Sequence, residues 1–386
     1  MNRRTYLRAA TATAAASGLA GCSGFRPGGS GGDPGTSSSG GTLGAVDARV
    51  ETITSDLEVP WGAAFRDNAL YLTERPGRLL EVPSVAGGTG GEPEVVADLT
   101  DGTEPAGEGG LLGLEFDPRG RNVVYLYQTY STSKGIRNRV LRGDLADLES
   151  TARPIVEGIP ASSIHNGGRL AIDGDALYVT AGDASRSGFA RDRGSLAGKV
   201  LRYTLDGTPY PENPFGSAIY SYGHRNPQGL AFRDGRLYGT EHGPDHDDEI
   251  NLLEPGGNYG WPDVMGTGGD SGGNGGSGDG SDGGSTAPLA TYTPTVAPAS
   301  AAFYDGPIAD WQGDLFFGTL AGAFLGRAQV DGRTVGEQGT LLSGEFGRLR
   351  TAFTGPDDHL YMTTSNRDGR GSPAKPDDRV LRIRPR

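Results

Sequence analysis

Residues 69–73 read Ala-Leu-Tyr-Leu-Thr, and residues 77–82 read Gly-Arg-Leu-Leu-Glu-Val. A strand of the type apolar-Tyr-apolar-Thr, a polar turn, and a second strand that pairs basic with apolar residues is typical of a β-hairpin. The same pattern recurs along the chain. Its later copies begin at Val123, Ala176, Arg236, Asp314 and His359, and their second strands begin at Asn138, Gly198, Asp248, Ala323 and Arg379.

Six copies of one hairpin predict an all-β fold, a six-bladed β-propeller, because repeats of this length stack around a ring and so protect their sheet edges. No copy carries a long helical period. The segment from Ala48 to Ile53 precedes the first copy and is expected to close the ring by pairing with the last blade. The alternative is a two-sheet sandwich, but sandwiches do not repeat one pattern six times.

Composition supports one large, turn-rich domain, which we place at residues 45–386. The 386 residues include 67 glycines, too many for a chain built of long helices. Asp and Glu number 48 against 35 Lys and Arg, so the surface is expected to repel nucleic acid and anionic lipid. Nearly all the basic residues are arginine, and an acidic, lysine-poor surface suggests a halophilic protein.

The N-terminus has the pattern of an export signal, residues 1–22. Arg3 and Arg4 form a twin-arginine (Tat) pair, a weakly apolar run follows, and Cys22 stands where lipoprotein signals place the lipidated residue. We expect an extracytoplasmic protein, bound to the outer face of the cytoplasmic membrane only through a lipid on Cys22. The alternative is an ordinary signal that is cleaved nearby. Cys22 is the single cysteine, so no disulfide forms within the chain.

Two stretches lack the apolar residues needed to fold. Residues 23–44 are rich in Gly, Ser, Thr and Pro, and we expect a disordered tether between membrane and domain. Residues 266–285 are almost wholly Gly, Ser and Asp, and we expect a disordered surface loop. A nucleotide-binding glycine loop is excluded there, because no apolar strand leads directly into it and no helix follows.

Polar residues in the loops between strands are the candidates for chemistry, because blade ends converge on a central channel. His165 stands in Ile-His-Asn-Gly-Gly-Arg-Leu-Ala, a glycine-rich turn before a strand, and its imidazole could accept a proton from a substrate hydroxyl. Arg225 stands in Ser-Tyr-Gly-His-Arg-Asn-Pro-Gln-Gly-Leu and could bind a carboxylate or polarise a carbonyl. The alternatives are an exposed or structural histidine and a structural salt bridge.

Two further clusters suggest charged ligands. The stretch from Glu241 to Glu249 is dense in carboxylates and suits a hard cation such as Ca²⁺; the alternative is a solvated acidic loop. We do not expect a zinc site. Arg348 and Arg350 would share one face of a strand and call for an anion such as a polycarboxylate. The alternative is that one arginine lies on the rim and the other pairs with a nearby acid.

Together these motifs resemble the glucose/sorbosone dehydrogenase family, soluble aldose dehydrogenases that use pyrroloquinoline quinone (PQQ). The resemblance covers roughly Val59 to Ile383. It rests mainly on His-Asn-Gly-Gly-Arg-Leu from His165, Gly-His-Arg-Asn-Pro-Gln-Gly-Leu from Gly223, and the Glu-His-Gly-Pro to Asn-Tyr-Gly-Trp-Pro stretch from Glu241.

The resemblance implies a PQQ- and calcium-dependent oxidation of aldose sugars at the anomeric carbon to lactones, with electrons passed to an external acceptor. His165 would take the proton of the anomeric hydroxyl, and Arg225 and calcium would polarise the quinone carbonyl. The other implied site residues are Asn226, which holds the cofactor; Gly243 and Pro244, whose carbonyls bind calcium; and Arg348 and Arg350, which grip the carboxylates of the cofactor.

Two positions depart from the family pattern. Glu108 stands where relatives often have a glutamine near substrate and cofactor, and it could also bind calcium. Ala321 stands where relatives carry a lysine, so a cation for the cofactor is missing, and Arg327 or another arginine is the expected replacement. Both departures favour the alternative of a non-enzymatic propeller that binds sugar or protein. A calcium-dependent lactonase is the third possibility, and a second calcium near Glu249 or Tyr259 is left open.

Overall fold

The computed structural model describes residues 48–120, 122–267 and 284–386. The predicted signal, Cys22 and the predicted tether lie outside these residues, as does most of the predicted 266–285 loop. In the described part of the chain, no helix is long and apolar enough to cross a membrane.

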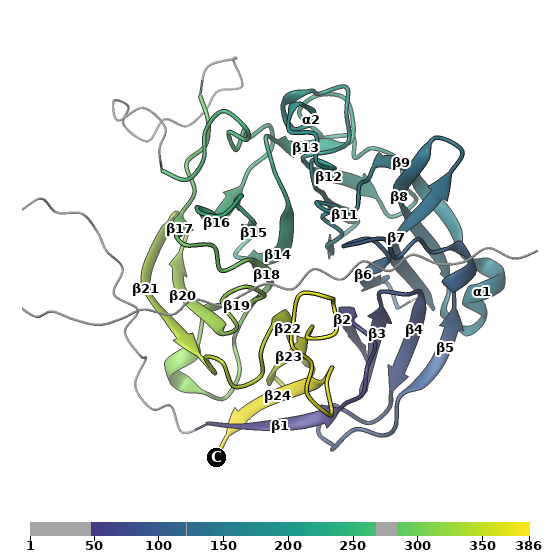
Figure 1. The fold of residues 1–386 in the computed structure, drawn as a ribbon, viewed down its shortest axis with the longest axis vertical. Helices are drawn as coiled ribbons and strands as arrows, with labels where there is room; N and C mark the ends of the chain where they lie inside the picture. Colours follow the sequence, from purple (N-terminus) through teal and green to yellow (C-terminus); the bar gives the residue numbers. More distant parts are fainter. Residues whose placement is uncertain (1–47, 121, 268–283) are drawn as a thin grey trace, which may run out of the picture. The chain divides into compact units, whose positions relative to one another are not determined.

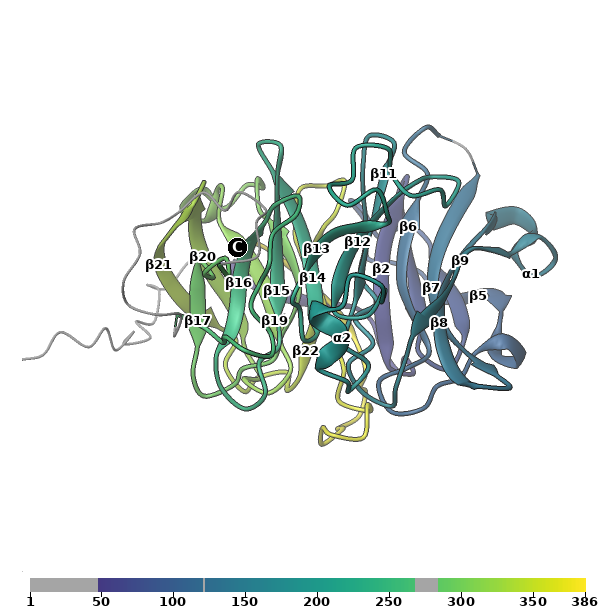
Figure 2. The ribbon, with the colours of Figure 1, turned by 90° about the horizontal axis from the view of Figure 1, so that it is seen from above.

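The described residues form six four-stranded antiparallel sheets arranged as blades around a central axis, which confirms the predicted propeller (Figures 1 and 2). From the innermost strand outward the blades are β2 (Pro60–Arg66), β3 (Ala69–Glu74), β4 (Arg78–Val82) and β5 (Glu94–Asp98); β6 (Leu111–Phe116), β7 (Val123–Thr132), β8 (Gly135–Asp144) and β9 (Arg153–Pro160); β10 (Leu170–Asp173), β11 (Ala176–Ala181), β12 (Lys199–Thr204) and β13 (Ile219–Tyr222); β14 (Pro227–Arg233), β15 (Arg236–Glu241), β16 (Asp248–Leu253) and β17 (Ala290–Tyr292); β18 (Pro298–Phe303), β19 (Leu315–Thr319), β20 (Leu325–Asp331) and β21 (Thr334–Leu341); and β22 (Leu349–Thr354), β23 (Leu360–Thr364), β24 (Val380–Pro385) and β1 (Ala48–Thr54).

The sequence repeat corresponds to the second and third strands of every blade, and the ring closes as predicted. Strand β1 pairs with β24 in an antiparallel register that sets Val50 opposite Ile383, so the last blade is built from both ends of the domain. This pairing covers the edge that an open ring would expose. The helical segments are single turns in loops: α1 (Leu148–Thr151), α2 (Gly188–Arg191), η1 (Thr100–Gly102), η2 (Leu145–Asp147) and η3 (Ala309–Trp311).

The threonine of the repeated pattern joins one blade to the next. The Thr73 hydroxyl, on the second strand of its blade, accepts the backbone N–H of Gly62 at 2.8 Å and donates to the carbonyl of Leu112 in the following blade. Thr240 donates in the same way to the carbonyl of Ala299. A hydroxyl can accept and donate at once, which an apolar residue of similar size cannot do. The recurrence of this residue therefore follows from the contact between blades.

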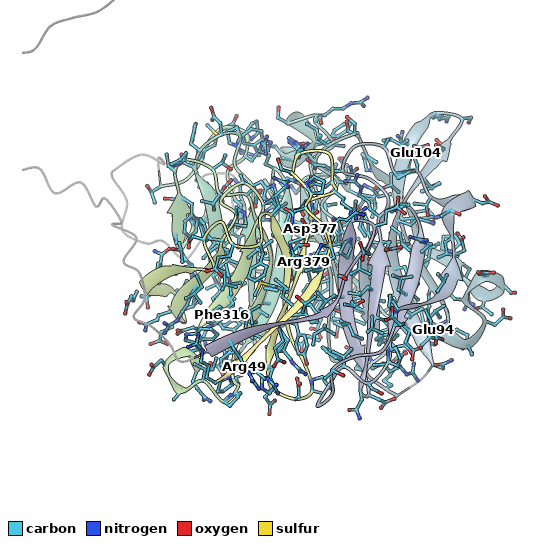
Figure 3. All side chains as sticks on the ribbon, turned by 60° about the horizontal axis from the view of Figure 1, so that its bottom comes forward. Arg49, Glu94, Glu104, Phe316, Asp377 and Arg379 are labelled. Carbon is cyan, nitrogen blue, oxygen red and sulfur yellow. The ribbon has the colours of Figure 1, made fainter. Side chains whose placement is uncertain are left out.

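Clusters of buried apolar side chains fill the space between each pair of neighbouring blades. Phe316 of β19 is fully buried in one of them, whereas Arg49 and Glu94 lie at the outside of the ring (Figure 3). Burial of this kind stabilises the fold by about 25 cal/mol for each Å² of apolar surface. The core is thus spread around the ring, and polar residues are left at the ends of the central channel.

Candidate active site

The axial channel has two cavities, one at each end. The smaller, about 210 Å³, lies where the innermost strands begin and is lined by residues of all six blades. Two of the predicted site residues, Glu108 and Arg350, line it directly. Trp61, Gln228 and His242 line it as well. This cavity is our candidate active site.

The structure holds His165 at the edge of this site in a strained backbone conformation, with φ of +61°. Its Nδ1 lies 2.8 Å from Oδ1 of Asp183, a buried carboxylate that can only accept hydrogen bonds. Nδ1 therefore carries the proton, and Nε2, which makes no hydrogen bond to the described residues, is left as an acceptor. Asp183 is itself fixed by the N–H of Ser185 at 2.8 Å and by Nε1 of Trp261 at 2.9 Å.

Glu108 joins His165 to the opposite side of the cavity. One carboxylate oxygen accepts the backbone N–H of His165 at 2.9 Å, and the other accepts Nη1 of Arg370 at 2.7 Å. Burial alone would raise the pKa of Glu108, but these two donors hold it below its usual value. Glu108 is therefore ionised at neutral pH and already has two partners.

Arg225 and Asn226 follow β13 and lie beside the cavity. Nη1 of Arg225 donates to the carbonyl of His242 at 3.2 Å and its guanidinium lies over the ring of Trp261, while its buried Nε has no partner among the described residues. The side-chain oxygen of Asn226 accepts the backbone N–H of Gly167 at 3.1 Å. The predicted pair is thus brought to the site, with one polar atom left unsatisfied.

His242 is a site residue that sequence reasoning missed. Its Nε2 is buried and unpartnered within the described residues, and burial lowers the pKa of the imidazole to about 4. The ring is therefore neutral at pH 7. An orphaned donor or acceptor in a protein interior is costly, and Nε2 of His242 indicates that this wall of the cavity is shaped for a polar ligand.

Arg348 and Arg350 differ in their surroundings. Arg348 donates from Nε and Nη2 to Asp368 at 3.0 and 2.8 Å and from Nη1 to the carbonyl of Leu320 at 2.8 Å. Arg350 lines the cavity, lies 4.0 Å from Asp368 and makes only long hydrogen bonds to Ser365 and Gln228, at 3.3 and 3.4 Å. One arginine of the pair, Arg348, is therefore bound to a nearby acid, Asp368, as in the alternative interpretation. Arg350 is the member of the pair that remains available to a ligand.

The predicted calcium ligands border a separate space of about 20 Å³. Gly243 and Pro244 line it together with Glu241, Glu249 and Arg225. The N–H of Gly243 is bonded to Asp248 at 2.8 Å. Among the described residues no group of three or more His, Cys, Asp or Glu side chains could hold a metal. The calcium site stays a prediction that rests on backbone carbonyls.

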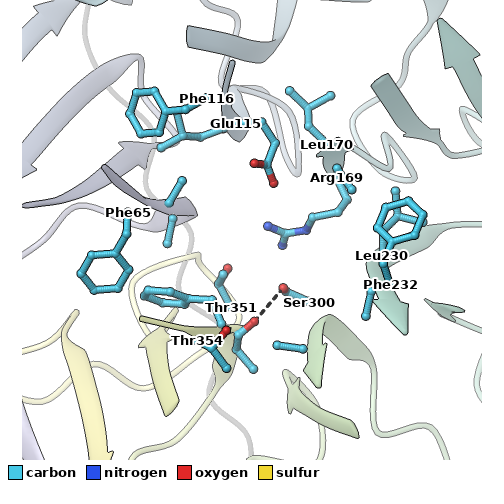
Figure 4. A pocket seen from close by; sticks show the side chains of 18 of the residues that line it. Phe65, Glu115, Phe116, Arg169, Leu170, Leu230, Phe232, Ser300, Thr351 and Thr354 are labelled. Atoms are coloured by element: carbon cyan, nitrogen blue, oxygen red, sulfur yellow. Dashed lines mark hydrogen bonds between the residues drawn. The ribbon is translucent and has the colours of Figure 1, made fainter. Parts of the chain in front are cut away.

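The larger cavity, about 960 Å³, lies at the other end of the channel and contains none of the predicted site residues (Figure 4). Arg169 separates the two cavities: it stacks 4.3 Å from the ring centre of Trp61, and its Nε donates to the carbonyl of Gln228 at 3.1 Å. Glu115 faces it across the larger cavity (Figure 4). The arginine of the His-Asn-Gly-Gly-Arg motif is therefore a support beneath the candidate site.

Comparison with known proteins decides the family. The family model described as Glucose / Sorbosone dehydrogenase matches residues 57–374. The chain belongs to this family. It is similar to the aldose sugar dehydrogenase of Escherichia coli (strain K12), which is 31% identical over 344 residues, 83% of this chain and 91% of the relative. The quinoprotein glucose dehydrogenase B of Acinetobacter calcoaceticus is 37% identical over 57% of this chain and 54% of its own.

A solved structure agrees with this assignment. The PQQ-bound form of the aldose sugar dehydrogenase from Streptomyces coelicolor superposes with a TM-score of 0.76 at 35% identity, covering 88% of this chain and 98% of that chain. Membership confirms the predicted family and enzyme class, an oxidoreductase of the sugar dehydrogenase type. Of the arginines expected to replace the missing lysine, Arg327 is not brought to the site, because it is paired with Asp314 and does not line the cavity, so another arginine is left as the alternative.

Proposed function

We propose that this family member oxidises aldose sugars at the anomeric carbon to lactones, with PQQ and Ca²⁺ as cofactors and an external electron acceptor. The observation that carries the proposal is the His165–Asp183 pair beside a cavity lined by arginines. A base with a free Nε2 suits removal of a hydroxyl proton, and an arginine-lined cavity suits an anion.

His165 would accept the anomeric proton at Nε2. The positive charge that forms on the imidazole would be stabilised by the carboxylate of Asp183, which is buried and therefore not screened by water. Glu108 holds the backbone N–H of His165, so the strained loop keeps the ring at the edge of the cavity. These residues accept and hold the proton while the substrate is oxidised.

The residues present fit the proposed cofactors. PQQ would be held by Arg350, Arg225 and Asn226, with His242 and Glu108 beside it. Two buried atoms that have no partner among the described residues, Nε of Arg225 and Nε2 of His242, would then gain hydrogen-bond partners. Arg348 would support Arg350 through Asp368. The carbonyls of Gly243 and Pro244 would bind calcium. PQQ, when bound, supplies the two-electron acceptor that no side chain provides.

We further propose that the enzyme works outside the cytoplasmic membrane, held by a lipid on Cys22. The twin-arginine pattern and the position of Cys22 support this location. An extracytoplasmic site would give sugar and acceptor direct access to the cavity. Globomycin-sensitive processing and membrane fractionation of wild-type protein and a Cys22→Ser variant test the anchor; a variant that stays bound to the membrane would contradict it.

The catalytic proposal is tested with purified protein in high salt. PQQ is titrated with and without Ca²⁺, and glucose and an artificial electron acceptor are then added. We expect saturable, calcium-dependent binding, reduction of the quinone absorbance by sugar, and loss of both after treatment with a chelator. A protein that binds no PQQ at any calcium concentration would refute the proposal and favour a non-enzymatic propeller.

A further inference from the structure

Arg75 enters the candidate site from the turn between β3 and β4, and its backbone is fixed on both sides. Its N–H donates to the carbonyl of Val59 at 3.2 Å, and its carbonyl accepts the N–H of Leu111 at 2.9 Å. A Cβ at Gly110 would lie only 2.5 Å from Cγ of Arg75, so the absence of a side chain there leaves room for the arginine stem. The side chain is thus directed along one path into the cavity that it lines.

The guanidinium of Arg75 makes no hydrogen bond or ion pair with the described residues. Burial lowers the pKa of this group, although it remains charged at neutral pH. Arg75 is half-buried, so part of its charge is withdrawn from bulk water without a hydrogen-bond partner among the described residues. A fixed stem with an unpaired head is the arrangement expected of an arginine that waits for an anionic ligand.

The acids around the cavity attract the charge of Arg75, but each has a closer arginine as its hydrogen-bond partner. Asp368 accepts two hydrogen bonds from Arg348, and Glu108 is bonded to Arg370. Arg75 and Arg350 are therefore the surplus cations of the cavity. Arg75 lies close enough to disfavour the charge of Arg350: burial, and then the nearby Arg348 and Arg75, lower the pKa of Arg350 to about 10.

We propose that Arg75 binds a carboxylate of the anionic cofactor together with Arg350, and so supplies the cation that is missing at Ala321. This inference rests on the proposed use of PQQ. Ala321 itself does not line the cavity, whereas its neighbour Leu320 does. The cation would then come from the turn after β3 and not from the loop after β19, on another blade of the same channel end.

The test is the dissociation constant of PQQ, measured by absorbance titration with Ca²⁺ present, for wild-type protein and for Arg75→Gln, Arg75→Lys and Arg233→Gln. Arg233 is the matched control, since it ends β14 at the other end of the channel, where it pairs with Asp305. We expect Arg75→Gln to weaken binding about 10- to 100-fold, the loss of one charge-assisted contact. Arg75→Lys should recover part of the affinity, and Arg233→Gln should bind as the wild type does.

The melting temperature of each variant without PQQ separates binding from a structural role. Because the guanidinium has no hydrogen-bond or ion-pair partner in the described part of the chain, Arg75→Gln should melt at the wild-type temperature or above it. A lower melting temperature with unchanged PQQ affinity would overturn the inference and make Arg75 a structural residue. Equal PQQ affinity of wild type and Arg75→Gln would overturn it while leaving the proposed function intact, whereas a wild type that binds no PQQ would refute the proposed function itself.

Discussion

Replacing Asp183 with asparagine tests how His165 is prepared to accept a proton. In the wild type, Oδ1 of Asp183 accepts both Nδ1–H of His165 and the N–H of Ser185, and Oδ2 accepts Nε1–H of Trp261. An asparagine can present only one oxygen. Placing that oxygen at the Oδ1 position preserves two hydrogen bonds, whereas the opposite orientation preserves one.

The structure therefore predicts that Asp183→Asn keeps the tautomer of His165 and loses only the negative charge behind it. A hydrogen bond to a charged group contributes about 1.5–3 kcal/mol, which corresponds to a fall in kcat of about 10- to 150-fold. Asp183→Ala removes the acceptor altogether. It should approach the full contribution of a positioned base, about 10²- to 10⁴-fold.

The assay is steady-state oxidation of glucose with an artificial electron acceptor, using variants loaded with PQQ and Ca²⁺. The dissociation constant of PQQ serves as the control and should change little, because Asp183 does not line the cavity. The asparagine leaves Nε1 of Trp261 facing an amide N–H, so the free energy of unfolding should also fall by about 1–3 kcal/mol. Equal losses in Asp183→Asn and Asp183→Ala would refute the tautomer argument, and wild-type kcat in both would refute the role of the pair.

Three further variants test the charges of the channel. Glu108→Gln removes a negative charge beside the cavity and should tighten PQQ binding about 3- to 10-fold in titrations. The pKa of Glu108 is lowered in the folded protein, so the stability that this carboxylate adds is present above its unfolded pKa and is lost as the pH falls. The variant should therefore lose less stability than the wild type on acidification. Arg350→Gln should weaken PQQ binding more than Arg348→Gln. Arg348→Gln should cost more stability in denaturant unfolding, about 2–4 kcal/mol, since it leaves the carboxylate of Asp368, a side chain that is 4% exposed, without its main partner. Burial raises the pKa of Glu115 to about 8, so the folded protein binds one more proton than the unfolded chain between pH 5 and 8. The free energy of unfolding of the wild type should therefore fall by about 1–3 kcal/mol from pH 5 to 9, and that of Glu115→Gln should fall less. A parallel fall in both proteins would contradict this.

The fold could be predicted from the sequence because its evidence is local and repeated. Each hairpin carries its own alternation of apolar residues and its own turn, and the hydroxyls of Thr73 and Thr240, at the end of second strands, join their blades to the following ones. The closure of the ring could also be predicted, because the segment from Ala48 to Ile53 precedes the first hairpin and is left over when six blades have been assigned. The repeat therefore fixed the architecture without knowledge of any long-range contact.

The candidate site was predicted only in part, because its partners are far apart in sequence. His165 was found from its glycine-rich turn, but Asp183 and Trp261 lie 18 and 96 positions further along the chain and meet it only when blades three and four are adjacent. A signal for Trp261 was present in the Asn-Tyr-Gly-Trp-Pro motif. Nothing local distinguishes Asp183, which stands in an Ala-Gly-Asp turn like many others.

Arg75 shows a different reason why site residues escape sequence reasoning. It stands in Thr-Glu-Arg-Pro-Gly, where an arginine after a strand suggests an ordinary salt bridge. Its neighbours in space include two acids, yet both are occupied by other arginines. A sequence shows that a charge is present, but only the arrangement of every neighbouring donor and acceptor shows that the charge has no partner. The cation that we propose in place of a lysine at Ala321 is therefore visible only in the arrangement of hydrogen bonds around the cavity, not in the local sequence.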